Sequence, residues 1–561
     1  MNISKHFVTV DNRRVHYLRA GAGPAVALLH SSPCSAKVLR PVMHVFGERF
    51  TTFAFDTPGF GLSDKLPIAA PSVEDFADAL AETLSTLGIE QVATYGRHTG
   101  ASIAVEFAAR HPQRCAMALA DGFAVFAKAY SHDQLEAYLE KITPVWDGAH
   151  LLRLWFRYRD QHAFWPWNNQ TAAARSDADI PDLDFLHRGV VELLEAGDDY
   201  RIGYAAPFRH RALGVLDDLK VPVCFGNRPG DSMYLTRGLY PASAWTEVLP
   251  RESGAATLAE RALLERHPAR GAPPPASPCT PLAGRSTTDF VDIDGVQILL
   301  RTIGEAVGTV APLLVIHQAP GSSALYEPLL VEIGKSRPVV AFDLPGHGES
   351  DALPGNPQSV AVWAAIAEKV LQRLGIRDVQ LYGHNSGAAV AVELARSLGD
   401  RVTGLALDAP IFLDDADRVR FVEKYAPSVE PTWEGAHWLR AWHHLRDSEL
   451  WWPWFERTHR TVRAAPPRID PAQLTLRVRE AMKQPTSYQP AWQAAVGYAW
   501  RDRLVEMRAP VLLMAAPEDT FAHLLPAVQA ATSGAVTIAV EDSAASRAQA
   551  LQPFLSSRGS P

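Results

Sequence analysis

Residues 94–100 read TYGRHTG and residues 381–387 read LYGHNSG, each between an apolar, strand-like run and an alanine-rich, helix-like run. A sharp turn from a strand into a helix requires a positive φ at its central residue. His98 and Asn385 occupy that place, and both residue types are among the few besides glycine that are enriched at positive φ. The two segments therefore predict the same strand–turn–helix unit at two places in the chain.

The remainder of the sequence repeats in the same way. Matched motifs are separated by 287 residues in the first part of each copy and by 288 residues further on, as for His30 and His317, or Asp231 and Asp519. A constant offset over such a length indicates a tandem duplication.

Each copy alternates short, nearly continuous apolar strands with helical segments, which indicates a mostly parallel, doubly wound sheet covered on both faces. The prolines between the copies favour an extended linker. We therefore predict an α/β protein of two tandem domains, each with a helical, tryptophan-rich cap. The predicted boundaries are domain 1 at 1–265 with its cap at about 125–205, a linker at 266–285, and domain 2 at 286–556 with its cap at about 412–492.

The order of further motifs gives a family resemblance. Residues 30–33 read HSSP and residues 317–320 read HQAP, while residues 56–64 and 343–351 share the pattern DxPGxGxSD. With the two turns above, this order resembles the α/β-hydrolase superfamily, in particular its capped epoxide hydrolase, haloalkane dehalogenase and esterase branch.

The resemblance implies that each turn is a nucleophile elbow, although neither copy has the usual serine there. It also implies that Asp231 and Asp519, after the seventh strand, occupy the position of the catalytic acid. The histidine that relatives carry after the last strand is missing from residues 247–254 and from residues 538–544. A contact between Asp231 and His98 is therefore an alternative use of the acid.

The two elbow residues differ in chemistry. His98 is a candidate general base or nucleophile, because imidazole titrates near neutral pH; the alternative is a residue kept only for its tolerance of positive φ. Asn385 cannot act as a base. It is either a second such conformational residue or a group that holds a substrate carbonyl.

The resemblance also implies an oxyanion hole in each copy, formed by amides of the loop after the third strand and of the residue after the elbow position. The candidate oxyanion or substrate-binding residues are His30, Ser31, Thr99, His317, Gln318 and Ser386. We expect His30 and His317 to orient their loops, and Gln318 to offer a further amide. Thr99 and Ser386 open a helix, so capping is the alternative role for their hydroxyls.

The cap blocks carry a repeated set of large side chains. Trp146 and Trp433, with His150 and His437 close behind, are candidates to face a mostly apolar pocket. The alternatives are that the tryptophans pack cap against core and that the histidines bond to neighbouring acids.

Composition narrows the function classes. The chain of 561 residues has a net charge of −8, four scattered cysteines and no basic block, which argues against a nucleic-acid partner, a disulfide framework and a zinc motif. Without a signal core or membrane-length apolar run, we expect a cytoplasmic protein that needs no cofactor or metal.

Three functions are compatible with these features. The first is a cofactor-free enzyme that acts on a small, largely apolar carbonyl or ester compound by hydrolysis, or by a lyase or isomerase-type proton abstraction at His98. The second is a catalytically inactive ligand-binding protein. The third is an intramolecular pseudo-dimer in which the second domain regulates the first.

Overall fold

The computed structural model describes residues 2–556 apart from 127, 129, 309 and 506. The chain divides into two compact units, Met1–Thr143 with Arg153–Thr280, and Pro144–Leu152 with Pro281–Pro561. Each unit contains one eight-stranded sheet. The predicted class, two tandem α/β domains with mostly parallel sheets, is confirmed.

The first sheet has the strand order β1-β2-β4-β3-β5-β6-β7-β8. An antiparallel hairpin of β1 and β2 pairs with β4, and all later neighbours are parallel. Its strands are β1 Ser4–Val10, β2 Arg13–Ala20, β3 Ala25–Leu29, β4 Thr51–Phe55, β5 Val92–Arg97, β6 Cys115–Asp121, β7 Val223–Asn227 and β8 Trp245–Val248.

The second sheet repeats this topology, with the order β9-β10-β12-β11-β13-β14-β15-β16. Its strands are β9 Thr287–Ile293, β10 Val296–Ile303, β11 Leu313–Ile316, β12 Val339–Phe342, β13 Val379–His384, β14 Val402–Asp408, β15 Val511–Ala515 and β16 Val536–Ala539.

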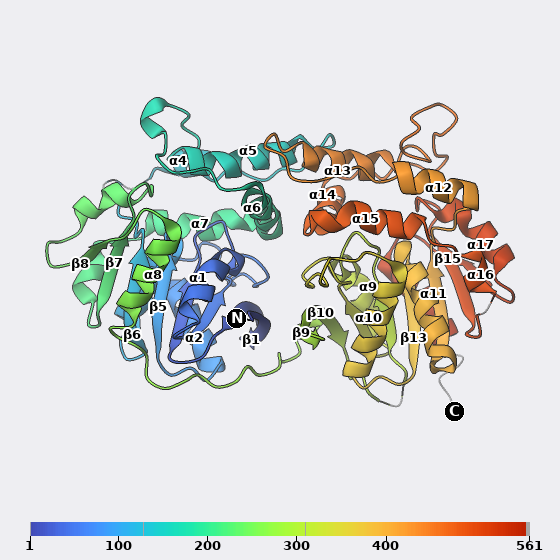
Figure 1. The fold of residues 1–561 in the computed structure, drawn as a ribbon, viewed down its shortest axis with the longest axis horizontal. Helices are drawn as coiled ribbons and strands as arrows, with labels where there is room; N and C mark the ends of the chain where they lie inside the picture. The colour runs from blue at the N-terminus through green and yellow to red at the C-terminus, as the bar shows by residue number, and fades with distance from the viewer. Residues whose placement is uncertain (1, 127, 129, 309, 506, 557–561) are drawn as a thin grey trace. The chain divides into compact units, whose positions relative to one another are not determined.

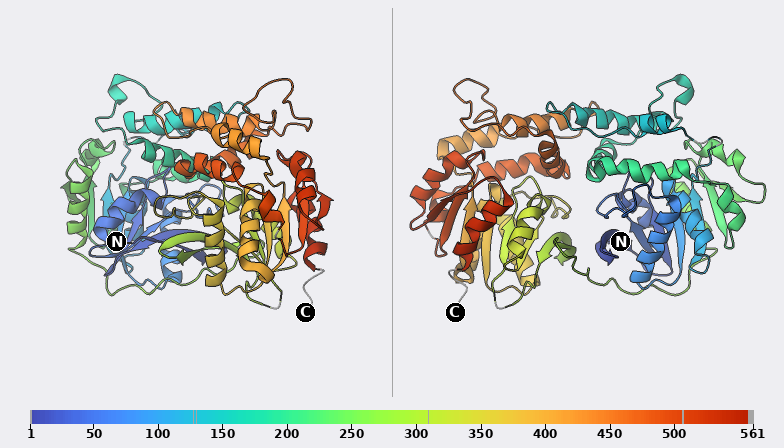
Figure 2. Two further views of the ribbon diagram at one scale, coloured as in Figure 1. Left: turned by 45° about the vertical axis from the view of Figure 1, so that its right-hand side comes forward. Right: turned by 180° about the vertical axis from the view of Figure 1, so that it is seen from behind.

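Helices cover both faces of each sheet (Figures 1 and 2). In the first unit, α1 and α8 pack on one face and α2 and α3 on the other, forming two apolar clusters with alternate residues of the strands. The second unit repeats this arrangement with α9 and α18 opposite α10 and α11. These helices are α1 Arg40–Phe46, α2 Val73–Thr86, α3 Thr99–Arg110, α8 Ser253–Leu264, α9 Glu327–Gly334, α10 Val360–Arg373, α11 Ser386–Leu398 and α18 Ala544–Ser556. The second unit also contains α16 Arg501–Leu504 and α17 Leu525–Ala531.

Further helices are inserted between the sixth and seventh strands of each sheet. In the first copy they are α4 His132–Tyr138, α5 Ala149–Ala163, α6 Leu183–Ala196 and α7 Tyr200–Arg209. In the second copy they are α12 Asp415–Lys424, α13 Ala436–Asp447, α14 Pro471–Met482 and α15 Pro485–Val496. Each set lies over one end of its own sheet, as a cap does (Figure 1).

The two strand-to-helix turns are tight. His98 has φ 50° and Asn385 has φ 48°, in the positive-φ region where few side chains are tolerated. Glycine is required at Gly96 because a Cβ there would lie 2.0 Å from the carbonyl oxygen of Gly100. The two turns therefore keep the elbow backbone that the sequence predicts. Within the part of the chain that the structure describes, no helix is both long and apolar enough to span a bilayer.

Candidate active site

The first site forms where β5 ends and α3 begins. The Nε2 atom of His98 lies 3.0 and 2.9 Å from the two carboxylate oxygens of Asp231, in the loop after β7. Since this contact uses Nε2 as the donor, the lone pair is left on Nδ1. No described residue forms a hydrogen bond with Nδ1, and a third of the His98 side chain (33%) is exposed.

Asp231 is held as a carboxylate. It is 6% exposed, and Arg97 approaches it to 3.5 Å. Burial opposes ionisation, but the adjacent His98 and Arg97 outweigh it and lower the pKa of Asp231 well below its usual range. The same Arg97 lies 3.6 Å from Asp121 and keeps 40% of its side chain exposed, so a partly exposed guanidinium lies next to the carboxylate that holds His98.

The loop after β3 lies beside this pair. His30 accepts a hydrogen bond at Nε2 from the Thr57 amide at 2.9 Å and contacts the Ser31 carbonyl through Nδ1 at 3.0 Å. The ring thus fixes the loop, which is the orienting role expected for His30. Neither the Ser31 nor the Thr99 backbone amide has a protein acceptor among the described residues.

His162, near the end of α5, is a residue of this site that the sequence did not single out. Its ring packs edge-on against Tyr158 and Phe185, and its Nε2 is buried with no hydrogen-bond partner. Burial, followed by the charges of Arg97 and His98, lowers the pKa of His162 to about 4. A neutral imidazole from the cap therefore lies close enough to Arg97 and His98 to sense their charges. His162 aligns with Glu449 of the second copy. A comparison of residues shared by the two copies therefore does not select it.

The second copy uses its acid differently. His384, the residue before the elbow position, lies with Nε2 3.2 Å from Asp519 and with Nδ1 2.8 Å from the Tyr326 hydroxyl. The side-chain amide nitrogen of Asn385 donates to the Ala409 carbonyl at 3.0 Å. Burial raises and the His384 hydrogen bond lowers the pKa of Asp519, with a net value of about 2.

Sequence reasoning missed both His384 and Tyr326, since it compared only the central elbow residues. His384 aligns with Arg97, and Tyr326 aligns with Leu39. Asn385 itself still cannot act as a base, and the imidazole of the second elbow lies one position earlier, at His384. The signal was present in the histidine that directly precedes Asn385.

The oxyanion loop of the second copy is occupied by its own side chains. The backbone amide of Gln318 donates to the Tyr326 hydroxyl at 3.2 Å. The Ser386 hydroxyl accepts from the backbone amide of Ala319 at 2.7 Å. The Ser386 hydroxyl therefore does not cap its own helix, as the sequence suggested, but bonds to the loop after β11. His317 repeats the role of His30 by accepting from the Leu344 amide at 2.9 Å.

A search with family models connects this geometry to known proteins. The model described as alpha/beta hydrolase fold matches residues 24–191 and 311–524. Together these segments make up more than half of the chain. The chain belongs to the alpha/beta hydrolase fold family. The two separate matches confirm the tandem α/β-hydrolase duplication that the motifs predicted.

Two curated relatives of the chain are enzymes of known name. The 2-(acetamidomethylene)succinate hydrolase of Mesorhizobium japonicum is 33% identical over 138 residues, which are 24% of this chain and 49% of that protein. The soluble epoxide hydrolase of Corynebacterium sp. is 35% identical over 106 residues, 19% of this chain and 37% of that protein. The chain thus spans about half or less of the length of these relatives.

Solved structures include the enol-lactonase from Burkholderia xenovorans LB400. It has a TM-score of 0.36 and 18% identity, and the match covers 48% of this chain and 97% of that one.

The conspicuous cap residues of this α/β-hydrolase do not line an enclosed pocket. Trp146 is 61% exposed and Trp433 is 48% exposed, because each lies in the turn before its cap helix. A pocket role for these two tryptophans is therefore contradicted.

The two cap histidines are also engaged elsewhere. His150, which groups with the second compact unit, contacts the Thr475 hydroxyl at 2.9 Å and accepts from the Val145 amide. His437 accepts from the Thr432 amide at 3.2 Å. These contacts are not with the neighbouring acids that the sequence offered as partners.

A separate cavity of about 250 Å³ lies in the first unit, along the chain after β4 and beside α7. It is lined mainly by apolar side chains such as Leu66, Ile68 and Phe76. None of its lining residues belongs to the His98 site, so it does not mark the candidate active site.

Proposed function

We propose that the first domain is a cofactor-free hydrolase in which His98 is the general base. The observation that carries this proposal is the pairing of His98 Nε2 with both oxygens of Asp231, which leaves the Nδ1 lone pair unpartnered. In a serine enzyme of this fold, a separate histidine links the acid to the nucleophile. Here the elbow residue itself reaches the acid, so the base stands where the nucleophile would stand.

This arrangement favours attack by water. His98 Nδ1 removes a proton as the water oxygen adds to the carbonyl carbon, and the Ser31 and Thr99 amides hold the resulting oxyanion. The proton then passes from His98 to the leaving oxygen as the carbon–oxygen bond breaks, giving an acid and an alcohol. Asp231 stabilises the imidazolium between these two steps. The same base and oxyanion hole also suit proton abstraction next to a carbonyl, which is the lyase or isomerase alternative.

The polar groups around His98 support a substrate that carries a carboxylate. Arg97 keeps two fifths of its side chain exposed beside the base, and planar guanidinium groups bind carboxylates bidentately. The unpartnered Nε2 of His162 adds a polar contact from the cap. The Mesorhizobium relative is named as a hydrolase of a succinate derivative, which agrees with this class. We therefore propose a small carbonyl or ester compound with one anionic group.

The second domain has a supporting role in this proposal. Both ring nitrogens of His384 are bonded, and the Gln318 amide is used by Tyr326. The Tyr326 hydroxyl thus occupies both the imidazole and the loop amide that a substrate would need. This closure favours a structural or regulatory second copy over a second catalytic centre.

A turnover screen tests the proposal. The full chain is assayed against small esters, enol esters, lactones and β-keto compounds, each with and without a carboxylate. We expect hydrolysis of at least one carboxylate-bearing member. Tight binding of such compounds without any product would favour the ligand-binding alternative and overturn the enzyme assignment.

A further inference from the structure

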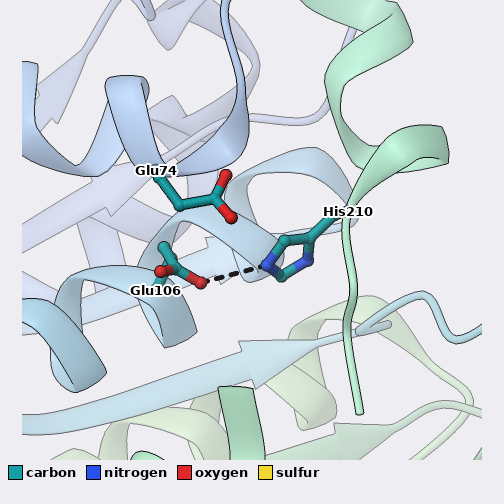
Figure 3. Close-up of side chains that lie close together, drawn as sticks. All are labelled: Glu74, Glu106 and His210. Atoms are coloured by element: carbon teal, nitrogen blue, oxygen red, sulfur yellow. Dashed lines mark hydrogen bonds and ion pairs between the residues drawn. The ribbon is translucent and has the colours of Figure 1, made fainter. Parts of the chain in front are cut away.

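A histidine and two glutamates from three helical segments meet on the first domain, away from the elbow. They are Glu74 in the first turn of α2, Glu106 in α3 and His210, which directly follows α7 (Figure 3). One ligand atom from each lies within 4.8 Å of the others. The side chain of His210 is 2% exposed and that of Glu106 is 8% exposed.

The polar contacts of His210 stay within this cluster. Its Nε2 lies 3.0 Å from Glu106 Oε2, and its Nδ1 is buried with no hydrogen-bond partner. Figure 3 shows the Glu74 carboxylate on the same side of the ring as Nε2. The imidazole is therefore buried with its one bonded nitrogen directed at two carboxylates.

The second copy shows what this position looks like with its charge balanced. Glu393, which aligns with Glu106, accepts from the Tyr498 hydroxyl at 2.9 Å. It is also within 3.2 Å of Arg396 and 3.3 Å of Arg503. Tyr498 aligns with His210. One carboxylate thus has two guanidinium partners and one hydroxyl.

The first copy lacks those cations and carries one more carboxylate. Ala109 and Val215 stand at the positions of the two arginines, and Glu74 stands where the second copy has Ala361. Among the described residues no Lys or Arg nitrogen lies within ion-pair distance of Glu74 or Glu106. The nearby Arg110 is committed to Asp78, at 3.0 Å from its Nε. Arg110 acts on both carboxylates only from beyond ion-pair distance, so a bound cation would complete the charge balance of two close carboxylates, one of them buried.

We propose that Glu74, Glu106 and His210 bind a divalent transition-metal ion of the zinc class. Imidazole nitrogen and carboxylate oxygen are ligands for such ions, and three protein ligands leave a fourth position for water. The metal takes the Nε2 lone pair of His210, so the proton resides on Nδ1. The sequence has no zinc motif because the three ligands come from separate helices.

The position of the cluster assigns it a structural purpose. His210 is where the chain returns from the last cap helix, and Glu106 lies seven residues after Thr99 on the helix that begins at the elbow, about 10 Å along its axis. A metal here clips the end of the cap to α2 and α3. It steadies the cap over His98 without taking part in the reaction.

The test uses the full chain, stripped with a chelator, dialysed against zinc chloride and freed of any affinity tag. Bound zinc is counted by elemental analysis, and unfolding temperature is measured with and without the ion. Two variants carry the residues that the second copy uses, Glu74→Ala and His210→Tyr. His111→Ala is the matched control, because His111, the residue that directly follows α3, pairs with Asp78 of α2 at 2.8 Å.

We expect each of the two variants to bind one zinc fewer per chain than the wild type and to lose the zinc-dependent rise in unfolding temperature, while His111→Ala keeps both. The rise follows from binding to the folded state only. A wild type that retains no zinc overturns the proposal. So does full retention by Glu74→Ala, whose partly exposed position makes misfolding no explanation.

Discussion

The pairing of His98 with Asp231 makes the substitution Asp231→Asn the most informative single change. In the proposed reaction His98 is neutral before the chemical step and an imidazolium after it. The carboxylate therefore favours the transition state over the bound substrate. An asparagine keeps the shape and an acceptor for the Met233 amide, which Oδ1 of Asp231 now accepts at 2.8 Å, but it removes the charge.

The size of the effect follows from the contact distances. Opposite charges 3 to 4 Å apart attract by about 5 kcal/mol at an effective dielectric constant of about 20. The His98–Asp231 contacts of 2.9 and 3.0 Å fall at this range. The asparagine oxygen retains part of the hydrogen bond, so about 3 to 4 kcal/mol of transition-state stabilisation is lost. At 1.36 kcal/mol per tenfold change, kcat falls by about 10² to 10³.

Steady-state kinetics on the best substrate of the screen measures this loss. We expect a lower kcat with KM nearly unchanged, because the lost interaction develops in the transition state. Asp519→Asn is the matched control in the second copy and leaves kcat as it was. A kcat for Asp231→Asn within threefold of wild type, in a protein with an unaltered unfolding temperature, would refute the reasoning.

Two further predictions concern substrate recognition and pH. Arg97→Gln raises KM about tenfold or more for carboxylate-bearing substrates and leaves KM for neutral analogues unchanged. Steady-state kinetics on both substrate classes measures this difference, and equal effects on both classes would count against a carboxylate contact. Burial raises the pKa of Glu192, which accepts from the Ser35 hydroxyl, from 4.5 to about 7. The unfolded chain thus holds fewer protons between these values, so stability falls as pH rises through them. Glu192→Gln removes this cost. Denaturant unfolding should show that the variant's free energy of unfolding exceeds that of wild type by about 2 to 3 kcal/mol at pH 8 and by less than about 1 kcal/mol at pH 5. A difference that is the same at both pH values contradicts the raised pKa.

The fold was predictable because the signals are local and repeated. The constant spacing between His30 and His317, or between the two elbow segments, requires two copies of one topology. Continuous apolar strands such as Ala25–Leu29 then require a sheet buried on both faces. Such patterns depend on chain geometry and survive a change of catalytic residues.

The site was less predictable because side-chain partners depend on three-dimensional placement. His384 and Arg97 are aligned, and both reach the acid after the seventh strand. Sequence comparison of the central elbow residues could not show that the second copy had moved its histidine by one position. Tyr326 enters its site through a 3₁₀ helix, Ser323–Tyr326, where the first copy has a leucine.

The tryptophans misled for a related reason. Aromatic side chains stabilise packing or fill pockets with equal ease, and sequence does not tell which turn of a cap faces solvent. Trp167, by contrast with Trp146, is 3% exposed and donates its ring N–H to the Tyr138 carbonyl. Trp167 therefore packs inside the cap, and His162 is the cap residue near the elbow.

The central claim is that chemistry resides at His98 and not at the equivalent residue of the second copy. Its most direct test is kcat/KM of His98→Ala beside Asn385→Ala on the best substrate of the screen. The account predicts that His98→Ala loses at least about 10³-fold of kcat/KM, in line with the removal of a general base, while Asn385→Ala stays within threefold of wild type. Unchanged turnover in His98→Ala, or an equal loss in both variants, would contradict it.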